Sequence, residues 1–319
     1  MQLSIVIPLY NEAESLPELS AWIVSVMQNR GIDYEILFVD DGSTDESWKI
    51  LSDLCRHNPA IRALRFSKNF GKSQALHAGF KRTRGQWVAT MDADLQDNPE
   101  ELPALLELMR SEEYDLVSGW KRKRYDNLIT KNIPSKLFNW AARKTSKIQL
   151  HDFNCGLKMY RSEVVKALDI KGEMHRYIPV LAASAGYNRI GEKEVTHQAR
   201  KYGTTKFGPE RFLNGMLDLM TVHFVSRFGR SPMHFFGAFG VLMFIFGFGG
   251  AFYMGIDKLF FNTTARLITD RPVFYLALSA MIIGTQLFLA GFIGELIIRN
   301  EGSKERYTIT ETLNSSTDS

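Results

Sequence analysis

Short apolar segments alternate with longer amphipathic segments from the start of the chain to about residue 120. The short segments are rich in β-branched residues, which predicts buried strands, and the longer ones repeat apolar residues at helical spacing. The expected strands are Leu3–Leu9, Tyr34–Asp40, Ile61–Phe66, Trp87–Asp92, Asp115–Trp120 and, further on, Leu157–Tyr160; the expected helices are Ala13–Arg30, Asp45–His57, Lys72–Thr83 and Pro99–Ser111. This alternation is typical of an α/β domain with a mostly parallel sheet covered on both faces.

The pattern changes after Pro209. Apolar residues fall at helical spacing between Arg211 and Phe228, which favours an amphipathic helix at a membrane interface. Two uncharged segments follow, Phe235–Met254 and Val273–Gly294. Each reaches the roughly 20 residues needed to cross a hydrocarbon core, so we expect two transmembrane helices, over about 233–255 and 273–296.

Composition narrows the class of protein. The 319-residue chain has a formal net charge of +4, too mild to indicate nucleic-acid binding. Its two cysteines, Cys55 and Cys155, form no disulfide or metal-binding pattern and are expected to be reduced thiols in the cytosol. The apolar N-terminus has no basic leader and no cleavage site, so it is interpreted as a first strand and not as a signal peptide.

The two spans would place both termini on one side of the membrane. Basic residues hardly decide which side, because they flank the spans and also occupy the loop between them. The reduced thiols and the lack of an export signal favour the cytosol for the N-terminal domain and for both termini.

Polar clusters follow three of the expected strands. They are Pro8-Leu9-Tyr10-Asn11-Glu12, Asp40-Asp41-Gly42-Ser43-Thr44-Asp45 and Asp92-Ala93-Asp94. The carboxyl ends of parallel strands lie at one edge of a sheet, so we expect all three clusters to meet at one crevice. Asp92 and Asp94 could share a hard cation such as Mg²⁺, which binds through one or two carboxylates plus substrate phosphates. An isolated pair of this kind would more simply be a solvated turn; the convergence of three clusters favours a metal-assisted site for a diphosphate.

Basic segments come later in the chain. The run Lys121-Arg122-Lys123-Arg124 is either a solvated loop or a binding site for phosphate or anionic lipid. A second basic loop, Arg200–Gly208, contains glycines and could fold over a phosphate-bearing ligand. Gly71-Lys72-Ser73 resembles the end of a P-loop, but Phe66 stands where its first glycine is required, and no dinucleotide-binding glycine motif follows a strand.

Taken together, these motifs resemble a known family. The residues that carry the resemblance are the three polar clusters and two further segments. The third cluster extends to Asp92-Ala93-Asp94-Leu95-Gln96, and the further segments are Asn69-Phe70-Gly71-Lys72 and Arg200-Lys201-Tyr202-Gly203-Thr204-Thr205-Lys206. Their order and spacing are similar to those of the polyisoprenyl-phosphate glycosyltransferases of family 2, related to dolichyl-phosphate mannose synthase and bactoprenol glucosyltransferases. The resemblance implies a Rossmann-like GT-A domain over 1–208, an interfacial region over 209–231, a two-helix transmembrane domain over 232–299 and a cytoplasmic tail over 300–319.

The resemblance also implies residue roles. The nucleotide would be bound by Pro8, Tyr10, Glu12, Asp40, Asp41 and Lys72. Mg²⁺ or Mn²⁺ would be held by Asp92, Asp94 and Gln96, with Arg200 and Lys206 on the diphosphate. The lipid phosphate would be received by Arg122, Arg124, Lys131 and Ser135. Asp92, Asp94 and Asp152 are the candidate catalytic residues, and the role of Asp152 stays open between acceptor orientation and sugar binding.

The implied activity is inverting transfer of a sugar from a nucleotide sugar to a polyprenyl phosphate, undecaprenyl or dolichyl, for cell-envelope glycan or lipopolysaccharide modification. Bacterial analogy favours UDP over GDP; glucose, mannose, a modified arabinose and an amino sugar all stay open. The enzyme would be a two-span protein of the plasma (inner) membrane, and a homo-oligomer, either a tetramer or a dimer, is a possibility that the sequence leaves open. The alternatives are a processive polysaccharide synthase, whose Q-x-x-R-W motif is missing, and a non-catalytic membrane scaffold.

Overall fold

The computed structural model describes residues 1–122, 148–170, 174–198, 201, 231–261, 267–300 and 307–314. The chain divides into two compact units. Unit 1 contains Met1–His223 together with Glu305–Ser319, and unit 2 contains Phe224–Lys304. The predicted amphipathic helix Arg211–Phe228 lies outside the described residues.

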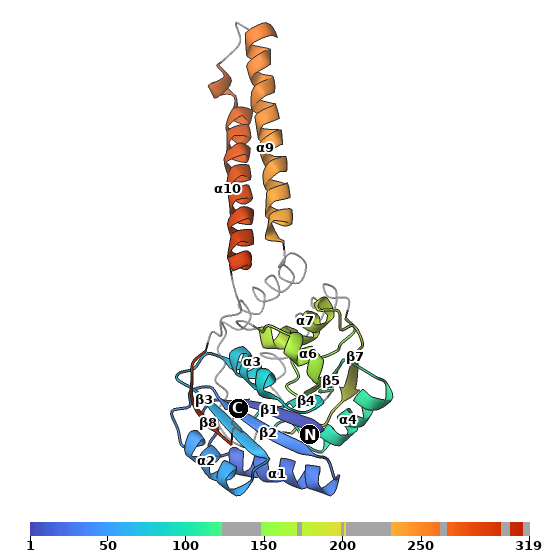
Figure 1. Cartoon of the computed structure of the whole chain (residues 1–319). Coiled ribbons are helices and arrows are strands. Elements are labelled where there is room, and N and C mark those ends of the chain that lie inside the picture. Colours follow the sequence, from blue (N-terminus) through green and yellow to red (C-terminus); the bar gives the residue numbers. More distant parts are fainter. Residues whose placement is uncertain are drawn as a thin grey trace. The chain divides into compact units, whose positions relative to one another are not determined.

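Unit 1 is an α/β domain (Figure 1). Its described strands are β1 (Leu3–Leu9), β2 (Tyr34–Asp40), β3 (Ile61–Phe66), β4 (Trp87–Thr90), β5 (Leu116–Trp120), β6 (Lys158–Arg161), β7 (Ile190–Glu194) and β8 (Ile309–Leu313). Its described helices are α1 (Leu16–Asn29), α2 (Ser47–His57), α3 (Lys72–Arg82), α4 (Glu101–Ser111), α6 (Ser162–Ala167), the 3-10 helix η2 (Met174–Tyr177) and α7 (Ile178–Ser184).

One eight-stranded sheet has the order β7-β5-β6-β4-β1-β2-β3-β8. The pairs β4/β1, β1/β2, β2/β3 and β5/β7 are parallel, whereas β6 is antiparallel to both of its neighbours and β8 is antiparallel to β3. The predicted mostly parallel α/β sheet is therefore confirmed. The order also makes β4, β1 and β2 consecutive neighbours, which brings the loops after these three strands to the same edge.

Successive side chains along the strands pack alternately into two hydrophobic cores, one on each face of the sheet. Ile5 and Ile7 of β1 pack with residues of α1, α2 and α4, while Val6 packs on the other face with residues of α3, α6 and α7. Figure 1 shows the same three layers, with α1 and α2 on one side of the strands and α3 and α6 on the other. Burial on both faces accounts for the nearly continuous apolar sequence of the central strands.

The eighth strand was not predicted. Residues 300–319 were expected to be a tail, but β8 pairs with β3 through the partners Ala63↔Leu313, Leu64↔Thr312 and Arg65↔Glu311. It follows unit 2 in the sequence and belongs to the sheet of unit 1. The edge of β3 is thereby covered, which removes a row of unpaired backbone groups.

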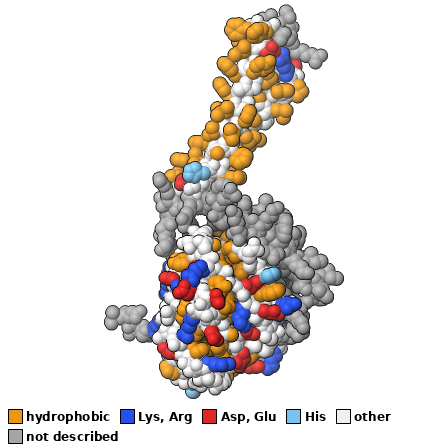
Figure 2. Space-filling model, turned by 90° about the vertical axis from the view of Figure 1, so that its right-hand side faces the viewer, with side chains coloured by type: hydrophobic (Ala, Val, Ile, Leu, Met, Phe, Trp, Pro, Cys, Tyr) orange, Lys and Arg blue, Asp and Glu red, His pale blue; other side chains and the backbone are white. Residues whose placement is uncertain are grey.

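Unit 2 contains two long apolar helices, α9 (Pro232–Ile256) and α10 (Pro272–Asn300), with the π-helical turn η3 (Asp257–Phe261) and the 3-10 turn η4 (Ile268–Asp270). Pro232–Phe261 and Pro272–Ile297 are long and apolar enough to cross a membrane, and Figure 2 shows hydrophobic side chains over their surface. The two helices approach closely at glycines: a Cβ added at Gly240 would lie 2.6 Å from the carbonyl oxygen of Gly284, and the converse distance is also 2.6 Å. Small residues at helix contacts are typical of helices packed in a bilayer.

Candidate active site

A cavity of about 560 Å³ lies in unit 1. We call it the central cavity. From the predicted site, it is lined by Pro8, Tyr10, Glu12, Asp41, Lys72, Asp92, Asp94 and Gln96. The three polar clusters thus contribute to one cavity, because β4, β1 and β2 are adjacent in the sheet.

The carboxylate of Asp41 connects two of the loops. It accepts hydrogen bonds from the backbone N–H groups of Phe70, at 2.7 Å, and Gly71, at 2.9 Å. These two residues come directly before α3, whose first residue is Lys72. Asp41 therefore fixes the start of α3 beside the cavity. These hydrogen bonds hold the segment Asn69–Lys72 at the same site as the acidic cluster that contains Asp41.

Asp92 and Lys72 form an ion pair across the cavity. Burial would raise the pKa of Asp92, but the ammonium groups of Lys72 and Lys121 lower this pKa to about 2. Gly156 leaves the space that the Asp92 carboxylate occupies, since an added Cβ would lie 2.7 Å from its Oδ2. Asp92 is thus held as an anion by its cationic neighbours.

The segment from Asp92 to Asp97 alternates between partly exposed and buried side chains. Asp92, Asp94 and Gln96 are partly exposed and line the cavity. Leu95 and Asp97 are buried, as is Ala93, which also contributes to the cavity lining. The backbone N–H of Gln96 donates to Asp94 Oδ1 at 3.2 Å, and Leu95 has a φ of 61°. A branched side chain in this left-handed region is strained, and such strain often marks a functional loop.

The set Asp92, Asp94 and Gln96 fits a hard divalent cation, because carboxylate and amide oxygens are the donors that Mg²⁺ prefers. Within the described part of the chain, no group of three or more His, Cys, Asp or Glu side chains is placed to hold a metal. Mg²⁺ commonly completes its coordination with substrate phosphates and water.

The buried carboxylate of Asp97 holds this segment in place through two contacts. Its Oδ2 accepts a hydrogen bond from the backbone N–H of Asp92 at 3.1 Å, and its Oδ1 lies 2.7 Å from Lys121 Nζ. Burial would lower the pKa of Lys121, but the Asp97 carboxylate raises it above the ordinary lysine value. Lys121 was predicted only as one charge of a basic run; the structure places it in the lining of the cavity.

The cavity residues that the sequence analysis missed include Lys158 and His175. Lys158 is 4% exposed on β6, where it pairs in register with Thr90 of β4, and burial lowers its pKa. His175, on η2, is bonded to Ser73 of α3: its Nδ1 lies 3.1 Å from the Ser73 hydroxyl, and burial lowers its pKa well below the usual value. For Lys158 the one signal in the sequence was a lysine within the apolar segment Leu157–Tyr160. Nothing in the local sequence indicates that His175 belongs to the site.

Three predicted site residues are not among those that line the central cavity. Asp40 is fully buried and accepts a hydrogen bond from the backbone N–H of Ser43 at 2.8 Å, so it supports its own loop. Asp152 is 2% exposed, and its carboxylate accepts from the N–H of Asn154 at 2.9 Å. Arg122 is exposed and lies 3.6 Å from Glu194. The other predicted residues, Arg124, Lys131, Ser135, Arg200 and Lys206, lie outside the described residues.

The mostly parallel sheet, with a cavity lined by the loops after β1, β2 and β4 and by the acidic segment, has the architecture of the GT-A fold. Solved structures with this architecture include glucosyl-3-phosphoglycerate synthase from Mycobacterium tuberculosis, in complexes with UDP and with Mn²⁺, UDP and glucosyl-3-phosphoglycerate. The second of these aligns with a TM-score of 0.54 and 18% identity over 70% of this chain and 79% of the other. At this identity the likeness is one of fold.

Sequence relatives identify the family. Residues 4–169 match the model of "Glycosyl transferase family 2". The dodecaprenyl-phosphate galacturonate synthase of Rhizobium johnstonii is 34% identical over 94% of this chain and 88% of its own length. The undecaprenyl-phosphate 4-deoxy-4-formamido-L-arabinose transferase of Enterobacter sp. is also 34% identical, over 93% and 88%. The chain belongs to glycosyltransferase family 2, among its polyprenyl-phosphate glycosyltransferases, as the resemblance in the sequence implied.

Proposed function

We propose that this chain transfers a sugar from a nucleoside diphosphate sugar, with UDP favoured as the nucleotide, to a polyprenyl phosphate, with inversion at the anomeric carbon. The observation that carries the proposal is the convergence of Asp92, Asp94 and Gln96 on one cavity with Lys72 and Lys121. The relatives named for polyprenyl-phosphate products support the acceptor, and the Mn²⁺ and UDP complexes of the fold neighbours support the donor.

The chemistry requires charge stabilisation more than proton removal. The bond between the anomeric carbon and the diphosphate oxygen breaks, and a phosphate oxygen of the acceptor forms the new bond on the opposite face. A phosphate monoester is already ionised near neutral pH, so the acceptor needs positioning by cationic groups and no general base. The leaving nucleoside diphosphate gains negative charge, which cationic side chains in the cavity can stabilise.

We assign the holding of Mg²⁺ or Mn²⁺ to Asp92, Asp94 and Gln96. When bound, the ion would act as a Lewis acid toward the diphosphate. Lys72 and Lys121 hold Asp92 in its ionised state. Lys121 also forms an ion pair with Asp97, which fixes the acidic segment. Pro8, Tyr10, Glu12 and Asp41, on the loops after β1 and β2, are proposed to bind the nucleotide.

The membrane unit suits a lipid acceptor. A polyprenyl chain stays in the bilayer, so an enzyme that acts on its phosphate has to work at the headgroup level. We propose that α9 and α10 anchor the chain in the plasma membrane, with the catalytic unit and both termini in the cytosol. Arg122, Arg124, Lys131 and Ser135 remain proposed ligands of the lipid phosphate, and Arg200 and Lys206 remain proposed ligands of the diphosphate.

The experiment that tests the function is incubation of the purified protein with undecaprenyl phosphate, Mn²⁺ and a panel of UDP- and GDP-sugars, followed by mass spectrometry of the lipid. One sugar phosphate lipid is expected. No lipid product with any donor would support the scaffold, and a growing polysaccharide would support the processive synthase.

The substitution Asp94→Ala tests the site. Removing a carboxylate proposed to hold the metal should lower transfer by about a hundredfold or more, the scale on which lost electrostatic stabilisation acts. The protein should stay folded and membrane-bound, because Asp94 lies in the cavity lining and outside the core. Asp53→Ala is the matched control, since Asp53 is an exposed residue paired with Arg56. Full metal-dependent activity in the Asp94 variant would show that the site is misassigned.

A further inference from the structure

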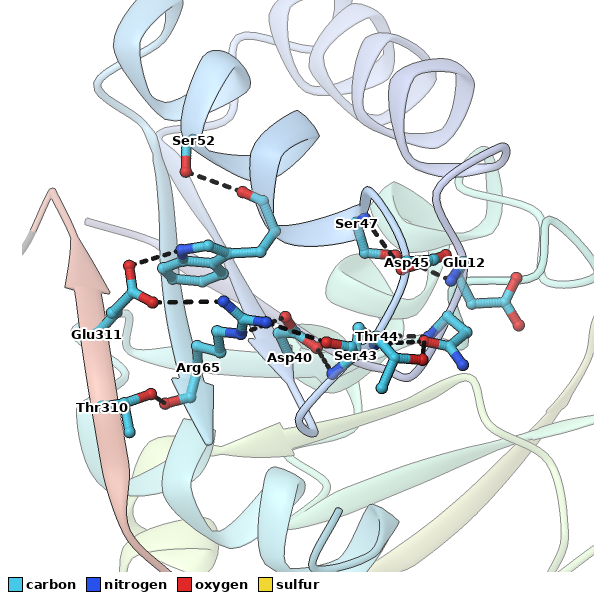
Figure 3. Close-up of polar contacts among 12 residues, drawn as sticks. Glu12, Asp40, Ser43, Thr44, Asp45, Ser47, Ser52, Arg65, Thr310 and Glu311 are labelled. Atoms are coloured by element: carbon cyan, nitrogen blue, oxygen red, sulfur yellow. Dashed lines mark hydrogen bonds and ion pairs between the residues drawn. The ribbon is translucent and has the colours of Figure 1, made fainter. Parts of the chain in front are cut away.

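Glu311, on the unpredicted strand β8, makes two contacts with the body of unit 1. Its Oε2 accepts a hydrogen bond from the indole Nε1 of Trp48 at 2.8 Å, and its Oε1 lies 3.4 Å from Nη1 of Arg65. The guanidinium of Arg65 lies over the Trp48 ring, 5.7 Å from the ring centroid. Figure 3 shows the carboxylate of Glu311 facing both side chains. A carboxylate from the end of the chain thus fixes the position of Arg65.

Arg65 reaches in turn into the loop after β2. Its Nη2 donates to the backbone carbonyl of Ser43 at 3.0 Å, and its Nε lies 3.6 Å from Asp40 Oδ2 (Figure 3). Asp40 is fully buried, so its carboxylate needs a cationic neighbour. Burial raises the pKa of Asp40, and Ser43 and Arg65 act in the opposite direction. Arg65 therefore holds both ends of the turn that begins at Asp40.

This turn holds the loop after β1. The hydroxyl of Ser43 accepts from the backbone N–H of Asn11 at 2.9 Å, and Asn11 Oδ1 accepts from the N–H of Thr44 at 2.8 Å. Asn11 has a φ of 56°, in the left-handed region that asparagine adopts more readily than most residues. Its two neighbours in the sequence, Tyr10 and Glu12, line the central cavity. Hydrogen bonds thus connect β8 through Arg65 and Ser43 to Asn11, the residue between two that line the cavity.

We propose that Glu311 and Arg65 are positioning residues that fix the loops after β1 and β2 and thereby set the affinity of the enzyme for its nucleotide donor. The inference relies on the proposed function for the identity of the ligand. Neither residue is among those that line the cavity. A loop already held in its bound conformation has less freedom to lose on binding, so the strand that returns after the two candidate spans strengthens binding without touching the ligand.

The first test needs no ligand. In Glu311→Ala, hydrogen exchange of the backbone amides of Ser43 and Thr44 should become faster, because the turn loses the support of Arg65. Thr312→Ala is the matched control: Thr312 is the next residue of β8, is exposed and makes no described side-chain hydrogen bond. Unchanged exchange in Glu311→Ala would overturn the proposal. If that variant folds poorly, Glu311→Gln, which keeps an acceptor for Trp48, gives the same comparison with less disturbance.

The second test separates binding from chemistry. Glu311→Ala should raise the Kd for UDP, titrated with Mn²⁺, and the KM for the nucleotide sugar by about threefold to fivefold, as expected for a partly exposed charge pair, with kcat nearly unchanged. Arg65→Lys should keep part of the affinity that Arg65→Met loses, because lysine retains the charge. A purely structural defect would instead lower kcat and the amount of active enzyme.

The outcomes distinguish the two proposals. A wild-type protein that binds neither UDP nor GDP, titrated side by side, would overturn the nucleotide donor of the proposed function, and the exchange measurement would still decide the role of Glu311 in holding the loops. Normal donor affinity in Glu311→Ala, beside a wild type that binds UDP, would overturn the positioning role alone.

Discussion

At the scale of single residues, the acidic segment illustrates what can be predicted from the sequence. Asp92 and Asp94 were predicted because two carboxylates at alternate positions follow an apolar strand, and Gln96 was implied by the family resemblance; all three line the cavity. The pairing of Lys121 with Asp97 could not be predicted. A lysine in a run of four basic residues is more simply a solvated charge, whereas the side chain of this one is 12% exposed and lines the cavity.

The ion pair of Lys72 and Asp92 leads to a prediction about pH. In the wild type, the pKa of Asp92 is about 2, so this carboxylate is ionised at every pH above that value. In Lys72→Met, Asp92 stays buried but loses the charge that most strongly opposes the effect of burial, so the pKa of Asp92 should rise. Activity should fall at all pH values, and the ratio of wild-type to variant kcat/KM should grow as the pH decreases from about 8 to about 5.

The control for this prediction is Lys68→Met, since Lys68 lies over the Phe70 ring and does not line the cavity. Its kcat/KM should follow the wild-type pH profile. A constant ratio for Lys72→Met across the pH range would mean that Lys72 contributes charge without controlling the ionisation of Asp92.

At the scale of elements, local pattern predicted the first five strands within two residues at either end, because each is a buried apolar segment with turn residues on both sides. It did not predict β8, whose Glu311 and Thr312 make it appear polar. The partner of β8 is β3, far earlier in the sequence, so no local signal indicates the pairing. The same limit applies to the cavity residues Lys158 and His175, which the late strand β6 and the 3-10 helix η2 bring into place.

The turn after β2 gives a prediction about stability. Gly42 has a φ of 72°, and an added Cβ would lie 2.4 Å from the carbonyl carbon of Lys68; Gly31 has a φ of 61° and nothing within 4 Å. Gly31→Ala should therefore show only the cost of a left-handed alanine, roughly 1 kcal/mol, or about 2–4 °C in the melting temperature. Gly42→Ala adds a backbone clash and should lower the melting temperature by at least about twice as much.

The two melting temperatures are compared by thermal unfolding in the same detergent, with donor binding measured in parallel. Gly42→Ala should also weaken UDP binding, because Asp41 lines the cavity next to it. Equal losses of stability in the two variants would mean that the loop of Lys68 moves aside freely and that the close approach of Gly42 is not a constraint.

At the scale of the whole molecule, the sequence predicted a soluble α/β unit and a pair of apolar helices, since both signals are long and strong. It did not predict that the chain returns after α10 to complete the sheet of unit 1. This return has a consequence for orientation. Unit 1 receives strands from both sides of the apolar pair, so the segments before α9 and after α10 have to lie on the same side of a membrane.

The orientation itself can be tested by labelling introduced cysteines. Cys55 and Cys155 are both buried and should give little background. Leu267, between the two helices, is 64% exposed, and the side chain of Asp33 in unit 1 is also 64% exposed. In intact spheroplasts, a membrane-impermeant maleimide should label Leu267→Cys and leave Asp33→Cys unlabelled; after lysis it should label both. Labelling of Asp33→Cys in intact spheroplasts would place the catalytic unit outside the cell, where a nucleotide sugar is not supplied, and protection of both sites would mean that the apolar pair does not cross the bilayer.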